Sequence, residues 1–282
     1  MKKYARRGLD SNGNMFFIIS LFMIYTFSSS DSGYGQTATL TIITENGSVV
    51  KYPDLAQYEV GDSVQLVALP DPGYFFYDWQ INTRNEVNNP VSTNINRDTT
   101  VTATFASIPL NGETYYVDQN HPGANDSNAG IESEPFLTIQ QALDIVKPKD
   151  TVIVKTGNYD EFVRTQRDGA ENAYITIKAA NNEDVAMQGM MFQNNYYKAQ
   201  GFIIERTGEI TGGDTLYSAF EIRPGTSCIE INNNRILVTG YNRSAIFCRS
   251  GNGHVTNNIS ILNNTFGPTD DAGGICVRMN GK

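Results

Sequence analysis

The chain has 282 residues, and 40% of them are hydrophobic, which is enough for a large buried core and excludes disorder throughout. Its formal net charge of −9 argues against nucleic acid as a partner, because phosphate binding needs a basic surface. The three cysteines, Cys228, Cys248 and Cys276, are an odd number, which rules out a complete disulfide framework. The sequence argues against a zinc site of the Cys/His type, because it has two histidines, His121 and His254, and contains no Cys-x-x-Cys motif.

Residues 1–35 have the pattern of a signal peptide. Basic residues near the N-terminus precede an apolar run at residues 15–27, and a serine-rich stretch follows it. The run has 13 residues. The apolar core of a signal peptide has about 7–15 residues, whereas a helix that crosses a bilayer needs about 20. We therefore expect a secreted or bacterial cell-surface protein with no membrane segment once the signal is removed. An uncleaved anchor is the alternative.

Residues 37–106 predict a small β module. Alternating apolar residues at 63–69 and 100–105 indicate strands with one buried face, and turn signals such as Asn46-Gly47 separate the strands. The residues that carry a family resemblance are Gly47, Tyr58, Gly61, Val64, Leu66, Ala68, Pro70, Gly73, Tyr74, Phe76, Trp79, Pro90, Val101, Ala103 and Phe105. On these residues, the segment resembles one divergent repeat of the internalin B type, which occurs on many bacterial surface and secreted proteins.

An aromatic cluster lies in the middle of this module. It consists of Tyr74, Phe75, Phe76, Tyr77 and Trp79. Packing is the favoured interpretation, since strand alternation directs Tyr74 and Phe76 inward as core residues. A sugar-stacking platform is the alternative, because sugar faces pack on aromatic rings. Residues 107–114 then form a short linker that contains Pro109 and Gly112.

Residues 115–159 contain the one predicted helix. Its apolar residues are Ile139, Ala142, Leu143 and Val146. They recur with the 3.6-residue period of an amphipathic helix and therefore lie on one face. Thr138 is the expected N-cap, Gln141 completes a capping box, and Pro148 ends the helix. The β-branched run at residues 151–155 predicts a return to strands.

A second family resemblance spans the same segment. Its motif combines an aromatic strand, a loop rich in Gly, Asp and Asn, the helix and a β-branched strand. The matching residues are Tyr116, Val117, Gly123, Asp126, Gly130, Pro135, Phe136, Thr138, Ile139, Gln140, Ala142, Asp150, Thr151, Val152, Val154, Gly157 and Tyr159. On these residues, the chain resembles right-handed parallel β-helix domains of extracellular polysaccharide lyases, such as pectate lyase and chondroitinase B. The resemblance implies an all-β fold, in which the β module precedes an incomplete right-handed parallel β-helix at residues 115–282, capped by one short α-helix.

Internal repeats support a solenoid independently of that resemblance. Residues 229–236 match residues 259–266 at an offset of 30, and residues 219–223 match residues 245–249 and 274–278 at successive offsets of 26 and 29. Stacked coils would place apolar side chains in continuous columns. The two expected columns are Phe220/Ile246/Ile275 and Ile222/Cys248/Val277.

Asparagines are expected at the bends between strands. Asn233 aligns with Asn263, and Asn234 aligns with Asn264. Asparagine tolerates left-handed backbone angles and can hydrogen-bond the amide of a stacked partner. The predicted helix should cover the open end of the first coil, which would otherwise expose apolar side chains and unpaired backbone groups. No second cap is recognisable, so we interpret the solenoid as the N-terminal part of a longer one.

Candidate groups for chemistry are few. The lyase resemblance implies proton abstraction next to a uronate carboxyl, with calcium or arginine neutralising that carboxyl. Asp270 and Asp271 are the candidate calcium ligands, although a solvated turn is the favoured alternative. No segment matches a catalytic base motif, so the catalytic residues stay unassigned. The lysines of the early coils (Lys155, Lys178 and Lys198) have no recognisable partner groups.

Three arginines are expected to form a column on the outside of the solenoid. Arg223, Arg249 and Arg278 follow the aligned strands and would lie about 4.8 Å apart on successive coils. Such like charges repel unless anions lie between them, so an acidic glycan would fit there. Pairing with Glu221 and Glu230 is an equally weighted alternative.

These observations predict a secreted protein that binds or acts on an acidic polysaccharide, as the N-terminal part of a β-helix lyase. A non-catalytic adhesin or glycan-binding surface protein is the alternative. Calcium is the expected cofactor, no nucleic acid is expected to bind, and the protein is expected to be a monomer.

Overall fold

The computed structural model describes the strands Gly8–Leu9 and Met15–Phe16 and residues 35–206, 218–238, 244–248 and 256–267. The chain divides into two units, Met1–Tyr34 and Gly35–Lys282. In the first unit, β1 (Gly8–Leu9) pairs antiparallel with β2 (Met15–Phe16). The rest of the expected signal peptide up to Tyr34 lies outside the described residues.

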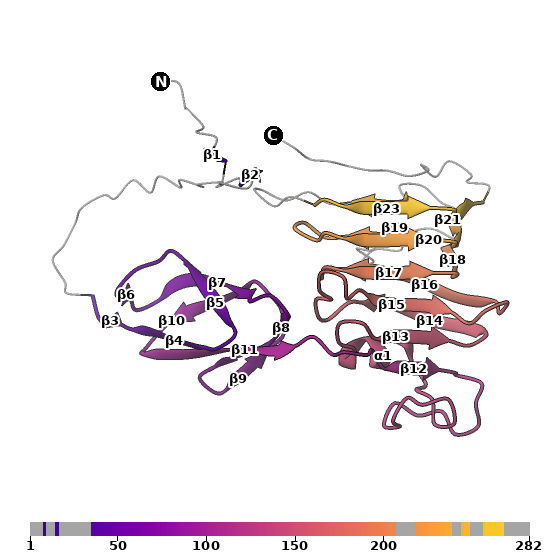
Figure 1. The fold of residues 1–282 in the computed structure, drawn as a ribbon, viewed down its shortest axis with the longest axis horizontal. Coiled ribbons are helices and arrows are strands. Elements are labelled where there is room, and N and C mark those ends of the chain that lie inside the picture. The colour runs from indigo at the N-terminus through magenta and orange to yellow at the C-terminus, as the bar shows by residue number, and fades with distance from the viewer. Residues whose placement is uncertain are drawn as a thin grey trace. The chain divides into compact units, whose positions relative to one another are not determined.

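The second unit begins with a small, mainly antiparallel β module at residues 37–107 (Figure 1). Its strands are β3 (Thr37–Ala38), β4 (Leu40–Thr44), β5 (Gly47–Tyr52), β6 (Tyr58–Glu59), β7 (Asp62–Pro70), β8 (Tyr74–Ile81), β9 (Arg84–Glu86), β10 (Val91–Ile95) and β11 (Thr99–Ser107). They form the sheets β10-β7-β5 and β4-β11-β8-β9 and the short pair β3-β6. The strands predicted at residues 63–69 and 100–105 are confirmed by β7 and β11.

Aromatic side chains of β8 form the core of the β module. Trp79 is fully buried, its ring lies 5.0 Å from that of Phe76, and its Nε1 donates to the Asn88 carbonyl at 3.1 Å. A register shift of β8 against β11 between Thr104 and Phe105 allows Phe76 and Trp79 to face the same core. The packing interpretation of these two rings is therefore confirmed.

The solenoid, which the structure describes between residues 114 and 267, consists of parallel strands and one helix. Its elements are β12 (Thr114–Val117), α1 (Ile139–Ile145), β13 (Thr151–Val154), β14 (Gly157–Arg164), β15 (Ile175–Ala179), β16 (Val185–Phe192), β17 (Tyr197–Gln200), β18 (Ile203–Arg206), β19 (Ser218–Ile222), β20 (Ile229–Asn232), β21 (Arg235–Val238), β22 (Ser244–Cys248), β23 (Ile259–Leu262) and β24 (Thr265–Phe266).

Two parallel sheets run across the coils of the solenoid. One has the order β12-β13-β15-β17-β20-β23, and the other has the order β22-β19-β16-β18-β21-β24, with β14 paired to β16. The long strand β16 pairs first with β18 and then with β19, on either side of Gly189. Gly189 has φ of 150°, which favours glycine, so the chain turns there from one face of the coil to the next. This arrangement confirms the predicted right-handed parallel β-helix.

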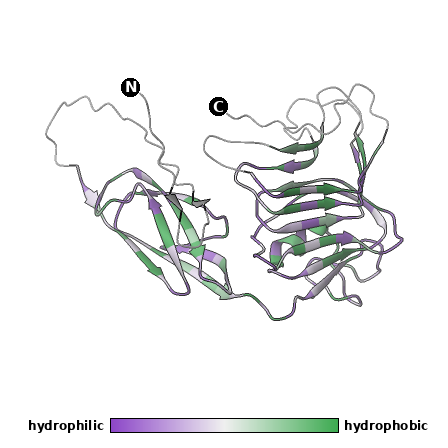
Figure 2. Ribbon diagram, turned by 45° about the horizontal axis from the view of Figure 1, so that its top comes forward, coloured by the Kyte–Doolittle hydropathy of each residue, from purple (hydrophilic) through white to green (hydrophobic). Residues whose placement is uncertain are grey.

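The predicted columns and bends are present where the structure describes them. Phe220 pairs in register with Ile246, and Ile222 with Cys248, and all four are buried. Matching positions on the stacked strands carry hydrophobic residues (Figure 2). The third members of both columns, Ile275 and Val277, lie outside the described residues.

The asparagine bends have the expected backbone geometry and hydrogen bonds. Asn233 and Asn263 both have φ of 55°. The Asn234 side-chain amide donates to Asn264 Oδ1 at 3.0 Å and to the Ala199 carbonyl at 3.1 Å. Each bend is thereby linked to the coil on either side of it.

Helix α1 packs its apolar face against the first coil. Ile139, Ala142, Leu143 and Val146 are fully buried in the same core as β12, β13 and β14. Thr138 caps the helix by accepting from the Gln141 N–H at 3.3 Å. The second hydrogen bond of the predicted capping box, from the Thr138 N–H to the Gln141 side chain, is wrong, because the Thr138 N–H donates to Asp126 Oδ1 at 2.8 Å. Among the described residues, no helix has the length and apolar character needed to span a membrane.

Candidate functional site

The solvent-facing side of the six-stranded sheet carries a group of tyrosines and charged residues. Strand registers set their order, since Ile175 pairs with Tyr197 and Tyr197 pairs with Ile229. The inward residues of these strands are buried, and the residues between them face outward. We call the outward group the tyrosine–lysine patch, and it consists of Tyr174, Lys178, Tyr196, Lys198 and Glu230.

The centre of the tyrosine–lysine patch is the contact between Lys198 and Tyr174. Lys198 Nζ lies 4.7 Å from the Tyr174 ring centroid and 3.0 Å from Glu230 Oε2. The Tyr196 ring meets the Tyr174 ring edge to face, with centroids 5.6 Å apart. Burial raises the pKa of both phenols, and the nearby Cys228 thiol adds to the shift. Both hydroxyls therefore stay protonated at neutral pH and can donate hydrogen bonds.

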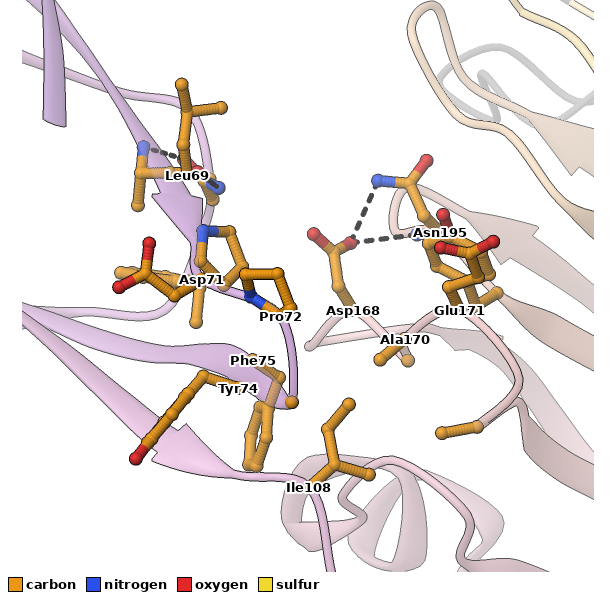
Figure 3. Close-up of a pocket in the computed structure, with 18 of the residues that line it drawn as sticks. Leu69, Asp71, Pro72, Tyr74, Phe75, Ile108, Asp168, Ala170, Glu171 and Asn195 are labelled. Atoms are coloured by element: carbon orange, nitrogen blue, oxygen red, sulfur yellow. Dashed lines mark hydrogen bonds between the residues drawn. The ribbon is translucent and has the colours of Figure 1, made fainter. Parts of the chain in front are cut away.

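Tyr196 is held in an uncommon backbone conformation. Its φ is 61°, a left-handed value that bulky residues rarely adopt and that costs on the order of 1–3 kcal/mol. The neighbouring residue Asn195 is fixed by Asp168, whose Oδ1 accepts from the Asn195 backbone at 2.8 Å and from its side chain at 3.2 Å (Figure 3). A side chain at Gly169 would collide with Tyr196, so glycine is needed beside it. Asp168 and Gly169 are thus positioning residues for the tyrosine ring.

Tyr196 is also among the lining residues of a pocket of about 920 Å³, part of whose lining is drawn in Figure 3. Its other lining residues include Asp71, Tyr74, Phe75, Ile108, Asp168 and Glu171. Burial raises the pKa of the Asp168 carboxyl, and the hydrogen bonds from Asn195 oppose that shift. Its three carboxyl groups outnumber its one ammonium group, that of Lys149, so this pocket is a poor place for the predicted acidic sugar, and the tyrosine–lysine patch is the better candidate.

The predicted arginine column is described only at Arg223. Its Nη1 lies 3.1 Å from Glu221 Oε1, so the structure shows pairing with Glu221, one of the two expected alternatives. Glu230 pairs with Lys198 instead. The other predicted site residues lie outside the described residues, and they are Arg249, Arg278, Asp270 and Asp271. The column and the calcium site therefore stay predictions.

The prediction that the early lysines have no partner groups is wrong for two of them. Lys198 contacts Tyr174 and Glu230, and Lys155 contacts Glu132 and the Tyr116 ring. The aligned aromatic residues before β15 and β17 were a usable signal, but they stand at an offset of 22, shorter than the later repeats. Within the ranges that the structure describes, no three His, Cys, Asp or Glu side chains are grouped to hold a metal ion.

Parallel coils that stack in register, with a helix packed on the first coil and an aromatic, charged outer face, define this protein as a parallel β-helix protein. Residues 122–276, more than half of the chain, match the family described as protein of unknown function (DUF1565). The chain belongs to this family. Residues 27–109 match the divergent InlB B-repeat domain, which confirms the resemblance of the β module.

Other similarities cover parts of chains. The chain is 28% identical over 95 residues to the uncharacterized protein YwoF of Bacillus subtilis (strain 168), covering 34% of this chain and 20% of that protein. It is similar to the GH136 lacto-N-biosidase from Eubacterium ramulus with 16% identity and a TM-score of 0.46, covering 55% of this chain and 34% of that one. It is similar to a rhamnogalacturonan lyase with 18% identity and a TM-score of 0.40, covering 60% of this chain and 64% of that one. This chain thus spans about a fifth of YwoF and a third of the lacto-N-biosidase.

Proposed function

We propose that this protein is exported and binds an acidic polysaccharide on the tyrosine–lysine patch of its solenoid. The observation that carries the proposal is the placement of Lys198 Nζ 4.7 Å from the Tyr174 ring centroid, beside a second partly exposed tyrosine, Tyr196. A sugar ring can lie against the tyrosine faces while its carboxylate reaches the ammonium group.

The charges of the patch suit exchange with a ligand carboxylate. Lys198 and Glu230 are 32% and 31% exposed, and an ion pair at such a surface contributes about 0–1 kcal/mol. Lys178 lies on the same face and, among the described residues, makes no ion pair. A uronate chain that crosses the strands would therefore meet two ammonium groups on neighbouring coils.

The proposal extends to two groups outside the described residues. Arg249 and Arg278 would add cations along the solenoid if the arginine column continues from Arg223. Cleavage of the glycan by a lyase reaction, with calcium at Asp270 and Asp271, is the further step that the family resemblance implies. Binding does not depend on that reaction, so it is tested first.

The test compares Lys198→Ala with Lys147→Ala, which removes the same charge from an exposed position at the end of α1. Affinity for polygalacturonate, alginate and dermatan is measured by titration calorimetry, with neutral galactan as the uncharged reference. Loss of a charge-assisted contact of about 1.5–3 kcal/mol predicts a fall of about tenfold or more for Lys198→Ala and none for Lys147→Ala. Arg249→Ala in the same assay tests the arginine column.

Equal affinity of the unaltered protein and Lys198→Ala for all three acidic glycans would remove the patch as the binding site. Binding of galactan as tight as that of polygalacturonate, and weakened equally by Lys198→Ala, would show that the ligand of the patch need not be acidic. Unchanged binding by Arg249→Ala would remove the arginine column alone.

A further inference from the structure

A second cavity lies at the end of the first two strands of the six-stranded sheet. It measures about 540 Å³, within the range of about 300–1,000 Å³ typical of small-ligand sites. Its chemically distinctive lining residues are Tyr116, Asp118, His121, Glu132, Lys155 and Glu183. They come from β12, from the loop after it, from the residue after β13 and from the turn between β15 and β16, so residues far apart in sequence meet there.

We propose that this cavity, which we call the cap pocket, binds an uncharged sugar residue of the glycan that the tyrosine–lysine patch holds. The inference rests on the proposed function, because it assigns a neighbouring part of the same ligand. The two sites differ in the charge of the sugar that they accept, which is uncharged in the cap pocket and negative on the patch. The cap pocket selects against the carboxylate that the patch attracts.

The cap pocket and the patch share one row of outward residues. Tyr116 pairs in register with Ile153, and Ile153 pairs with Lys178 of the patch. Adjacent strands lie about 4.8 Å apart, which places Tyr116 and Lys178 about 10 Å from each other along the sheet. A glycan that crosses the strands at Lys178 therefore arrives at the Tyr116 ring within a few sugar units.

The single cation of the cap pocket is already paired. Lys155 Nζ lies 3.0 Å from Glu132 Oε1 and 5.7 Å from the Tyr116 ring centroid. The hydrogen bond that Lys155 donates to Glu132 raises the pKa of Lys155, so the ammonium group keeps its proton at neutral pH. Lys155 thus holds Glu132 beside the ring, and the carboxylates of Asp118, Glu132 and Glu183 outnumber its one positive charge in the cap pocket.

Two of the acidic groups of the cap pocket, Glu183 and Asp118, are fixed by the backbone. Glu183 Oε2 accepts from the Thr156 N–H at 2.6 Å, and Asp118 Oδ1 accepts from the Asn120 N–H at 3.0 Å. Among the described residues, the second oxygen of each carboxylate makes no hydrogen bond. These oxygens are free to accept from ligand hydroxyls without reorganisation.

A histidine supplies the complementary donor. His121 Nδ1 accepts from the Gly123 N–H at 3.1 Å, so the neutral ring carries its proton on Nε2. The cap pocket therefore offers a ring for stacking, several carboxylate acceptors and an imidazole N–H donor, which matches the hydroxyls and ring face of a sugar. A uronate would bring a fourth carboxylate toward Asp118, Glu132 and Glu183, and like charges at such distances repel.

The test uses two disaccharides that differ only at C6, α-1,4-linked galactobiose and digalacturonate, with titration calorimetry on the full chain. We expect Tyr116→Ala to weaken galactobiose binding at least tenfold, and Tyr116→Phe, which keeps the ring, to change it less than threefold. Glu183→Gln keeps an acceptor for the Thr156 N–H and removes one charge. It should bring digalacturonate several-fold closer to galactobiose in affinity.

Two results would overturn the cap pocket: unchanged galactobiose affinity in Tyr116→Ala, or unchanged discrimination in Glu183→Gln. The second remains decisive if Tyr116→Ala does not fold. Lys198→Ala separates the two proposals, because it should weaken polygalacturonate and leave galactobiose unaffected. Loss of the Tyr116 effect alone overturns the cap pocket, and loss of the Lys198 effect alone overturns the patch.

Discussion

The β module and the solenoid both bury large rings, but the solenoid also carries two contacting tyrosines on an outer face. In the β module, the large rings face inward, where Trp79 and Phe76 lie 5.0 Å apart in a buried core. In the solenoid, columns of inward residues such as Tyr197 and Ile229 fill the inside of the six-stranded sheet, and Tyr174 and Tyr196 stand on its outer face. The outer rings of the solenoid are therefore available to a ligand, and the central rings of the module are not.

The strand arrangement explains this difference. A mainly antiparallel module of nine strands encloses one small space, which a few large rings fill. A parallel solenoid repeats the same narrow coil, so inward side chains stack in columns and outward positions recur about 4.8 Å apart. Regular spacing of this kind suits a polymer whose own units repeat.

The largest effect that separates the two regions is expected from Phe76→Ala. Removing the ring leaves a cavity beside Trp79 and should lower the free energy of unfolding of the β module by about 3–5 kcal/mol. Trp79 is the sole tryptophan, so its fluorescence during denaturant unfolding reports on the module. Hydrogen exchange at β15 and β17 should stay unchanged, because Phe76 belongs to a separate core cluster.

The matched control is Leu69→Ala on β7, where the side chain is 47% exposed and the expected loss is less than about 1 kcal/mol. Equal losses from Phe76→Ala and Leu69→Ala would contradict the packing role of the ring. Faster exchange throughout the solenoid in Phe76→Ala would show that the two cores do not act separately.

A smaller effect is expected at the bends that belong to the solenoid alone. Asn234→Ala removes hydrogen bonds to the Phe202 N–H at 2.9 Å and to the Ala199 carbonyl at 3.1 Å. Because Asn234 is buried, leaving those groups unpaired should cost about 1–3 kcal/mol. Thermal unfolding followed by circular dichroism measures the loss, and the Phe202 amide should exchange faster.

Asn233→Gly is the control for the bend, since Asn233 is exposed and has φ of 55°, which glycine adopts without strain. It should leave the midpoint of thermal unfolding nearly unchanged. A destabilisation as large as that of Asn234→Ala would mean that the bend depends on backbone conformation and not on the buried amide.

Local periodicity made much of the solenoid predictable. The 3.6-residue spacing from Ile139 to Val146 identified the buried face of α1, and the repeat of Ile229 at Ile259 identified strands that pair in register. The Asn233 and Asn263 bends followed from the same repeat. In each case a side chain's role depends on neighbours at a fixed spacing in the chain.

Contacts between distant residues could not be predicted in the same way. The first two N–H groups of α1 donate to the Glu161 carboxylate, at 2.9 Å and 3.0 Å. Glu161 lies in β14 at a shift in strand register, and no local sequence pattern marks that shift. The tyrosine–lysine patch was missed because Ile175 and Tyr197 pair at an offset of 22, while the recognised repeats run at 26 to 30. The left-handed backbone of Tyr196 is likewise visible only in three dimensions.

The most direct test of the difference between the two regions is an NMR titration, in which the chemical shifts of the backbone amides of the isotope-labelled protein are followed as trigalacturonate is added. Binding on the tyrosine–lysine patch predicts the largest shifts at β15 and β17, around Thr176 and Lys198, and none along β8. Shifts confined to β8, near Phe75 to Trp79, would contradict this assignment and place the glycan on the β module.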